Sequence, residues 1–106
     1  MDYVYSKNDY NLEIEIPEVF NLEALDSLRV LLLKLIDKNI KNVKFYCSHL
    51  ISIDGNGLTF FLSLAKYLRI VFINILLSFE ELNENVFKLL MIARLQSFYN
   101  LSMAEK

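Results

Sequence analysis

The sequence predicts an α/β fold in which helices pack mainly on one face of a mixed β-sheet. Short β-prone segments alternate along the chain with stretches whose apolar residues recur at helical spacing. With 106 residues, of which 55% are apolar, the chain is long enough to bury a core, and we expect one domain over residues 1–106. Two glycines and one proline leave no composition typical of a linker.

Three strands are predicted in the first half of the chain. Residues 3–5 are β-prone and precede a polar turn. In residues 11–16, leucine and isoleucine alternate with glutamate, which is the period of a strand with one solvated face. Residues 43–47 are expected to form an inner strand, because they follow a helix at the spacing of a strand–helix–strand unit.

The helix between those strands is predicted over residues 22–38. Leucines recur there at helical spacing, and Asn21 is a suitable N-cap with Glu23 in the first turn. We expect Asn39 to close this helix in the left-handed conformation, which asparagine tolerates better than most residues.

The C-terminal half predicts two further strands and a last helix. The apolar run over residues 70–77 is typical of a strand covered on both faces. Ser78 and Glu81 have the spacing of a capping box and predict the start of the last helix, with Asn85 as a second candidate start. Residues 97–101 predict a short terminal strand.

Both glycines of the chain lie in the segment Asp54-Gly55-Asn56-Gly57. A hairpin rule would place a turn between two strands here. The residues that follow instead share one helical stripe: Leu58, Phe61, Leu62, Ala65 and Leu68. We therefore interpret residues 54–57 as a tight elbow between a strand and a helix. Asp54 would cap that helix, and the glycines would supply positive φ angles or close approach of the backbone.

These residues resemble the STAS domain, the family of bacterial anti-sigma factor antagonists. In residues 45–58 a strand leads to an aspartate and then to a helix opened by Gly-Leu, and residues 86–101 are similar to the final helix and strand of the family. The resemblance covers about residues 12–101 in consistent order. It implies a single STAS-like domain that acts in signal transduction and transcription regulation by protein–protein contact.

The resemblance also implies a partner and a switch. The partner would be an anti-sigma factor of the kinase type, and phosphorylation of a serine directly after the aspartate would break the contact, because a phosphate adds about −1.5 to −2 charge. In this chain that serine position falls on Gly55, and the second hydroxyl position falls on Asn56. An antagonist would therefore be constitutive, controlled by its abundance or partner, or phosphorylated elsewhere, with Thr59, Ser52 and Ser48 as nearby hydroxyls.

A second apolar stripe on the helix after the elbow predicts a surface for a partner. A helix that is apolar on two sides is either deeply buried or covered by another protein. The alternative is that Phe60 packs against the first helix or a loop. The predicted partner-binding residues are Asp54, Gly55, Asn56, Gly57, Thr59, Phe60, Ser63, Leu64 and Tyr67.

Composition argues against several other classes of function. A net charge of −2 gives no basic excess for binding nucleic acid. One cysteine and one histidine cannot form an internal disulfide or a structural zinc site, so we expect Cys47 to be buried and His49 to lie on the surface. Glu80, Glu81 and Glu84 are expected to be solvated rather than to hold a metal. We find no nucleophile with its base and expect neither cofactor nor enzymatic activity.

The cellular location and the assembly are predicted less directly. The N-terminus lacks the pattern of a signal peptide, and the chain lacks an apolar span of about 18 residues, so we expect a cytoplasmic protein without membrane insertion. The mean hydropathy of +0.33 favours a permanent complex. The resemblance implies an alternative function, because some single-domain STAS proteins similar to this chain are cytoplasmic subunits of a membrane lipid-transport complex with an ABC ATPase. A homodimer and a small-molecule or lipid pocket near Asp54 also stay open.

Overall fold

The structure, a computed structural model, describes residues 2–72 and 74–105. Strands and helices alternate along most of the chain. In order, the elements are β1 (Tyr5–Lys7), β2 (Asn11–Glu15), α1 (Leu22–Leu35), β3 (Asn42–Tyr46), α2 (Gly55–Val71), β4 (Leu76–Leu82), α3 (Glu84–Ile92), the 3₁₀ turn η1 (Leu95–Ser97) and β5 (Asn100–Met103). The first strand lies further along the chain than the predicted residues 3–5, and the polar turn after it correspondingly begins later.

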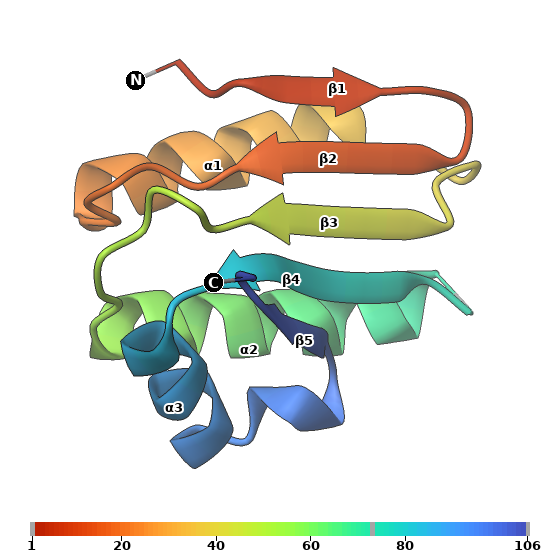
Figure 1. Cartoon of the computed structure of the whole chain (residues 1–106). Coiled ribbons are helices and arrows are strands. Elements are labelled where there is room, and N and C mark those ends of the chain that lie inside the picture. Colours follow the sequence, from red (N-terminus) through yellow and green to blue (C-terminus); the bar gives the residue numbers. More distant parts are fainter. Residues whose placement is uncertain (1, 73, 106) are drawn as a thin grey trace.

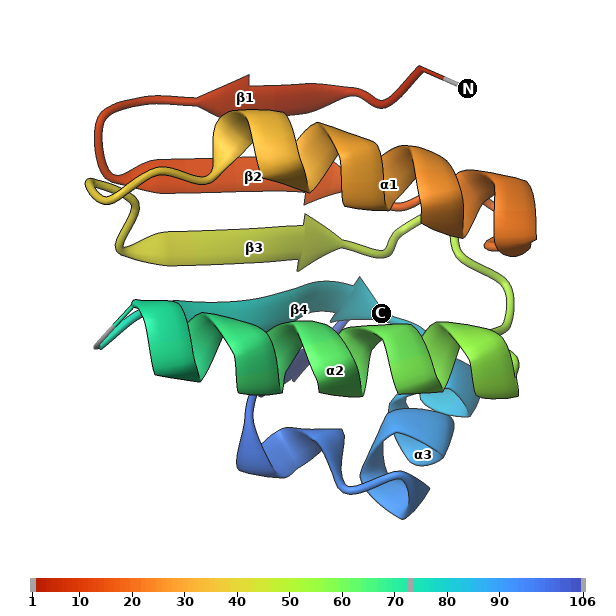
Figure 2. The ribbon, with the colours of Figure 1, turned by 180° about the vertical axis from the view of Figure 1, so that it is seen from behind.

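The five strands form one sheet in the order β1-β2-β3-β4-β5 (Figure 1). β1 is antiparallel to β2, whereas each of the other neighbouring pairs is parallel. Figures 1 and 2 show α1 and α2 side by side on the same face of the sheet, with α3 on the side of α2 away from α1. The predicted α/β fold, a mixed sheet with helices mainly on one face, is therefore confirmed.

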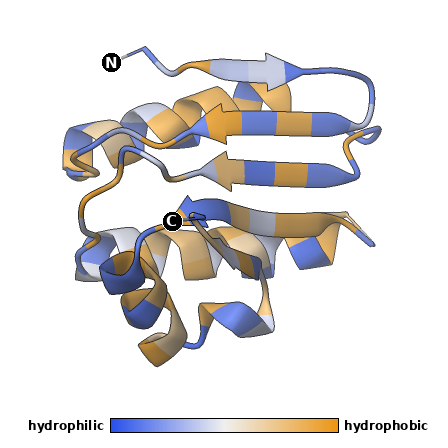
Figure 3. Cartoon of the chain, in the orientation of Figure 1, coloured by the Kyte–Doolittle hydropathy of each residue, from blue (hydrophilic) through white to orange (hydrophobic). Residues whose placement is uncertain are grey.

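Alternation of apolar and polar side chains decides which face of the sheet the helices cover. In β2 and β3 every second residue is buried, and the residues between them are half-buried. Figure 3 shows the matching alternation of hydrophobic and hydrophilic residues along these two strands. Leu12, Val43 and Leu77 pair across the three inner strands, as do Ile14, Phe45 and Phe79. These side chains are all at most 3% exposed, so burial of this apolar face against α1 and α2 forms the core.

The first helix begins where the sequence predicts and ends earlier. Asn21 caps it, with its side chain accepting a hydrogen bond from the Ala24 amide at 3.0 Å. The chain leaves the helix at Ile36, in extended conformation (φ −81°, ψ 122°). The prediction of a left-handed Asn39 is wrong, because positive φ angles occur at Asn74, Glu81 and Arg94 among the non-glycine residues described. The Asp37 side chain accepts from the Asn39 amide at 2.8 Å and forms the turn instead.

The predicted strand over residues 70–77 is wrong in its first half. α2 continues to Val71, and the Phe72 amide still bonds to the Leu68 carbonyl at 2.8 Å. The strand β4 begins only at Leu76; residue 73, in the middle of the predicted strand, lies outside the described residues. The helical stripe that continues through Leu68 outweighs the β-propensity of the branched residues, because the helix buries that stripe.

The start of the last helix also differs from both predictions. Ser78 and Glu81 belong to β4, which has a register shift between Phe79 and Leu82. The cap of α3 is Asn83, whose side chain accepts from the Val86 amide at 2.8 Å, so Asn85 lies inside the helix. The capping-box pattern predicts the wrong helix start, because β4 continues to the buried Leu82, beyond both Ser78 and Glu81.

Candidate functional site

The elbow lies at the end of the sheet where the parallel strands finish. Asp54 has an extended backbone, and its side chain accepts a hydrogen bond from the Gly57 amide at 2.9 Å. α2 starts directly after it, at Gly55. The prediction of Asp54 as the cap is therefore confirmed, and the carboxylate lies at the positive end of the α2 dipole. The predicted tight turn between strand and helix is wrong, because β3 ends at Tyr46 and residues 47–54 connect it to α2. We keep the name elbow for residues 54–57.

The two glycines of the elbow have different surroundings, and neither has a positive φ angle. A β-carbon on Gly57 would lie 2.7 Å from Cγ1 of Ile53 and 3.2 Å from Cδ2 of Phe20, so the backbone there approaches its neighbours closely. A β-carbon on Gly55 would meet no atom within 4 Å. The predicted close approach holds for Gly57 alone, and the predicted positive φ is wrong for both residues.

Two loops beside the elbow are tied to each other. The Ile51 amide donates to the Glu18 carbonyl at 3.2 Å, and Val19 forms an isolated parallel bridge with Ser52. The side chain of Asn83 donates to the Leu50 carbonyl at 2.8 Å. Val19 and Ile51 are 62% and 60% exposed, so these braced loops present apolar side chains next to the elbow. Sequence reasoning missed both residues, because nothing local distinguishes them from their buried apolar neighbours Phe20 and Ile53.

The residues predicted on α2 are partly exposed and partly packed. Thr59, Ser63 and Tyr67 are exposed, with Tyr67 at 56%. Phe60 is half-buried: its ring centroid lies 6.1 Å from that of Phe20, and the guanidinium of Arg29 in α1 lies over the ring at 5.6 Å. The alternative reading of Phe60, packing against the first helix or a loop, is therefore correct for this side chain.

A groove of about 670 Å³ runs between α1 and α2. Six predicted residues line it together: Asn56, Thr59, Phe60, Ser63, Leu64 and Tyr67. Asp54, Gly55 and Gly57 are not part of the lining. The opposite wall comes from α1, including Leu22, Arg29 and Leu33, which the sequence analysis did not assign. Leu22 and Leu33 are 60% and 74% exposed, and their spacing of about three helical turns was the signal that could have revealed this wall.

The lining of the groove holds one ion pair, and Cys47 and His49 are not part of it. In the groove, Asp26 and Arg29 form an ion pair at 2.6 Å. Cys47 is 1% exposed, and burial raises the pKa of its thiol to about 12, which agrees with the predicted buried residue. His49 is exposed as predicted, and its Nε2 lies 3.6 Å from Oε1 of Glu15. Within residues 2–72 and 74–105, the structure brings together no group of three metal-binding side chains.

No helix in the described part of the chain has both the length and the apolarity needed to cross a membrane.

Comparison with known proteins identifies the fold. No protein-family model matches the chain, and no curated protein matches its sequence. Among solved structures, the chain is similar to a crystal structure from Thermotoga maritima that is described as a putative anti-sigma factor antagonist. The TM-score is 0.76 at 15% sequence identity, over 94% of this chain and 85% of that one. The chain therefore has the same fold as this Thermotoga protein.

Proposed function

We propose that the chain is a non-enzymatic, cytoplasmic protein-interaction module that binds a regulatory protein through its elbow and α2. The partner is an anti-sigma factor of the kinase type. This proposal rests on one observation about the elbow. Its inner side is packed against the protein, and its outer side is exposed to solvent. Gly57 is packed against Ile53, whereas Asp54, Gly55 and Asn56 are exposed. The fold of the Thermotoga protein supports the proposal.

The contact is not switched by phosphate at the elbow. Gly55 and Asn56 carry no hydroxyl, and a phosphoryl group cannot be esterified to either side chain. Control by phosphate would require another exposed hydroxyl, such as that of Thr59 one turn further on in α2, or of Ser48 or Ser52 in the loop before the elbow. Incubation with a cognate kinase followed by a phosphate-affinity gel tests this point. A stoichiometric shifted band that survives Thr59→Val would contradict control at α2, and a shift lost in that variant would assign it there.

Substitutions on the exposed side of α2 test the interaction surface directly. Thr59→Arg and Ser63→Arg add a charge at exposed positions, so both variants should fold. We expect each to lose the partner in a pull-down, because an unpaired charge would be buried in the contact. Gln96→Arg, an exposed change in η1, is the matched control and should bind normally. Binding by all three variants would overturn the proposed surface.

Mass spectrometry of proteins that co-purify with the tagged chain at native abundance identifies the class of partner. A soluble kinase-like protein is the expected result. Recovery of an ABC ATPase with membrane components would instead establish the alternative function, a subunit of a lipid-transport complex. A small-molecule site near Asp54 has little support, because Asp54 does not line the groove.

A further inference from the structure

α1 and α2 run in the same direction on the sheet. β2, β3 and β4 are parallel, and each helix returns the chain from the end of one strand to the start of the next. Both helices therefore begin at the elbow end of the molecule (Figure 2). α1 has 14 residues, and at about 1.5 Å per residue it gives the groove a length of about 21 Å.

The middle of the groove is apolar and electrically neutral. Buried leucines form its floor: Leu25, Leu32 and Leu68. Its charged lining residues, Asp26 and Arg29, neutralise each other in the ion pair at 2.6 Å. An occupant that fits this lining presents apolar side chains over about four helical turns, as an amphipathic helix does when it binds between two helices.

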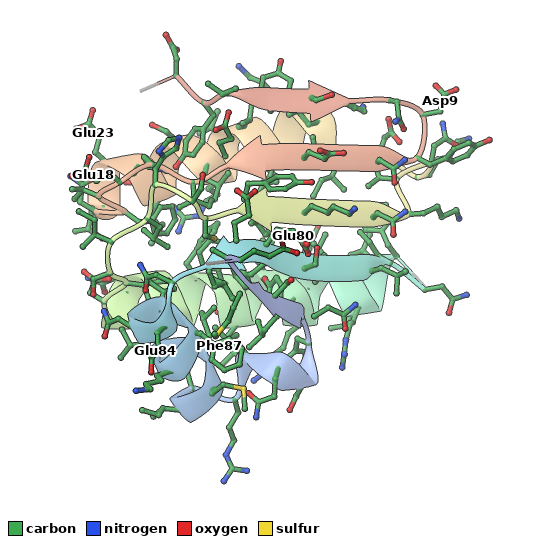
Figure 4. The ribbon with its side chains drawn as sticks, viewed as in Figure 1. Asp9, Glu18, Glu23, Glu80, Glu84 and Phe87 are labelled. Carbon is green, nitrogen blue, oxygen red and sulfur yellow. The ribbon has the colours of Figure 1, made fainter. Side chains whose placement is uncertain are left out.

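Beyond the two ends of the groove, outside its lining, exposed side chains differ in the sign of their charge. Glu23 follows Leu22 at the elbow end, and Asp54 caps α2 there. Figure 4 shows Glu18 at the same end as Glu23, whereas Asp9 lies at the opposite end of the molecule. At that opposite end Lys38 is exposed after the end of α1. Asp37 beside it forms an ion pair with Lys7 at 2.9 Å.

We propose that an amphipathic helix of the partner lies in this groove, antiparallel to α1 and α2, with basic residues in its C-terminal turn at the elbow. This inference rests on the proposed function and names the chemistry of the partner. Basic side chains stabilise the C-terminal end of a helix, where its dipole is negative. The antiparallel orientation therefore brings such an end towards Glu18 and Glu23, and brings an acidic N-terminal turn towards Lys38.

Two synthetic peptides test the orientation. Both are stapled amphipathic helices of about 14 residues with the same leucine face. One carries glutamates in its first turn and lysines in its last, and the other has these charges exchanged; helicity is matched by circular dichroism. We expect the first peptide to bind about two- to fivefold more tightly per favourable charge. Its amide chemical-shift changes should map to α1 and α2. Equal affinities, or no binding by either peptide, would overturn the inference.

Variants of the α1 wall separate this inference from the proposed function. Leu33→Asp should abolish binding of the first peptide, because Leu33 is 74% exposed and lies in the groove lining. Glu23→Lys should reduce the preference between the peptides, whereas Asp9→Lys makes the same change of charge away from the groove and should not. If the natural partner is lost with Thr59→Arg but retained with Leu33→Asp, the α2 surface stands and the helix in the groove is wrong.

Discussion

Ile53 lies so close to Gly57 that a β-carbon on the glycine would be 2.7 Å from Ile53 Cγ1. Isoleucine is branched at its β-carbon and cannot easily turn this atom away. We therefore expect Gly57→Ala to lower the free energy of unfolding by about 1–3 kcal/mol, as overpacked core substitutions do. Urea denaturation followed by circular dichroism measures the change.

Gly55 is the matched control for that substitution, because it has a helical position and open space around it. Gly55→Ala should leave the free energy of unfolding unchanged or raise it by up to about 1 kcal/mol, through lower entropy of the unfolded chain. Equal losses in the two alanine variants would show that glycine is required at both positions, and the packing account of the elbow would then fail.

Tyr99 connects the end of the chain to the middle of α2. Its hydroxyl donates to the Phe61 carbonyl at 2.7 Å, and the residue is 2% exposed. Tyr99→Phe keeps the ring, which lies 4.5 Å from that of Phe79 between centroids, and removes only the hydroxyl. We expect the free energy of unfolding to fall by about 1 kcal/mol. Tyr10→Phe, at a 59% exposed position, should change the thermal midpoint little, and a similar fall there would contradict the role of this hydrogen bond.

Alkaline pH should destabilise the fold through buried acidic groups. Burial raises the pKa of the Cys47 thiol from 9.0 to about 12, and it also raises the pKa of Tyr99 well above its ordinary value. Above pH 9 the Cys47 thiol loses its proton in the unfolded chain and keeps it in the folded chain. This contribution to the free energy of unfolding is therefore fully present below pH 9 and is lost as the pH rises. Cys47 alone contributes a slope of about 1.4 kcal/mol per pH unit.

Urea unfolding at about pH 8 and about pH 10 measures that slope. Cys47→Ala is the control, since it removes the titrating thiol and should make the loss between the two pH values smaller. An unchanged pH dependence in this variant would show that Cys47 does not carry the effect.

The fold could be predicted because the dominant signals are local and agree with the burial pattern. The alternation in β2 and the leucine spacing of α1 fix which face of each element is buried, and the cap residues Asn21 and Asp54 act within one turn of their helices. The sequence predicted the wrong element where two local patterns competed in the same segment. At Ile70 and Val71, β-propensity opposed a helical stripe, and the stripe prevailed because Leu68 is 1% exposed.

The sequence predicted only one of the two walls of the groove, the one formed by α2. The elbow and α2 follow each other along the chain, so their residues could be assigned together. The α1 wall comes from a segment about 30 residues earlier, and nothing local links Leu33 to Leu64 until β2, β3 and β4 are placed as parallel neighbours. The braces between the loops depend on the same placement, since Ile51 and Asn83 approach each other only in the folded sheet.

The side chain of Asn83 makes two hydrogen bonds whose contributions can be measured separately. Its oxygen caps α3 by accepting from the Val86 amide at 2.8 Å, and its nitrogen donates to the Leu50 carbonyl at 2.8 Å in the loop before the elbow. Asn83→Asp keeps the acceptor and loses the donor, so α3 should stay stable while the loop opens more often. Asn83→Ala loses both and should cost about 1 kcal/mol of stability in addition. Hydrogen exchange distinguishes the outcomes: we expect faster exchange of the Ile51 amide in both variants and of the Val86 amide in Asn83→Ala alone, because only the donor ties the elbow loop to the start of α3.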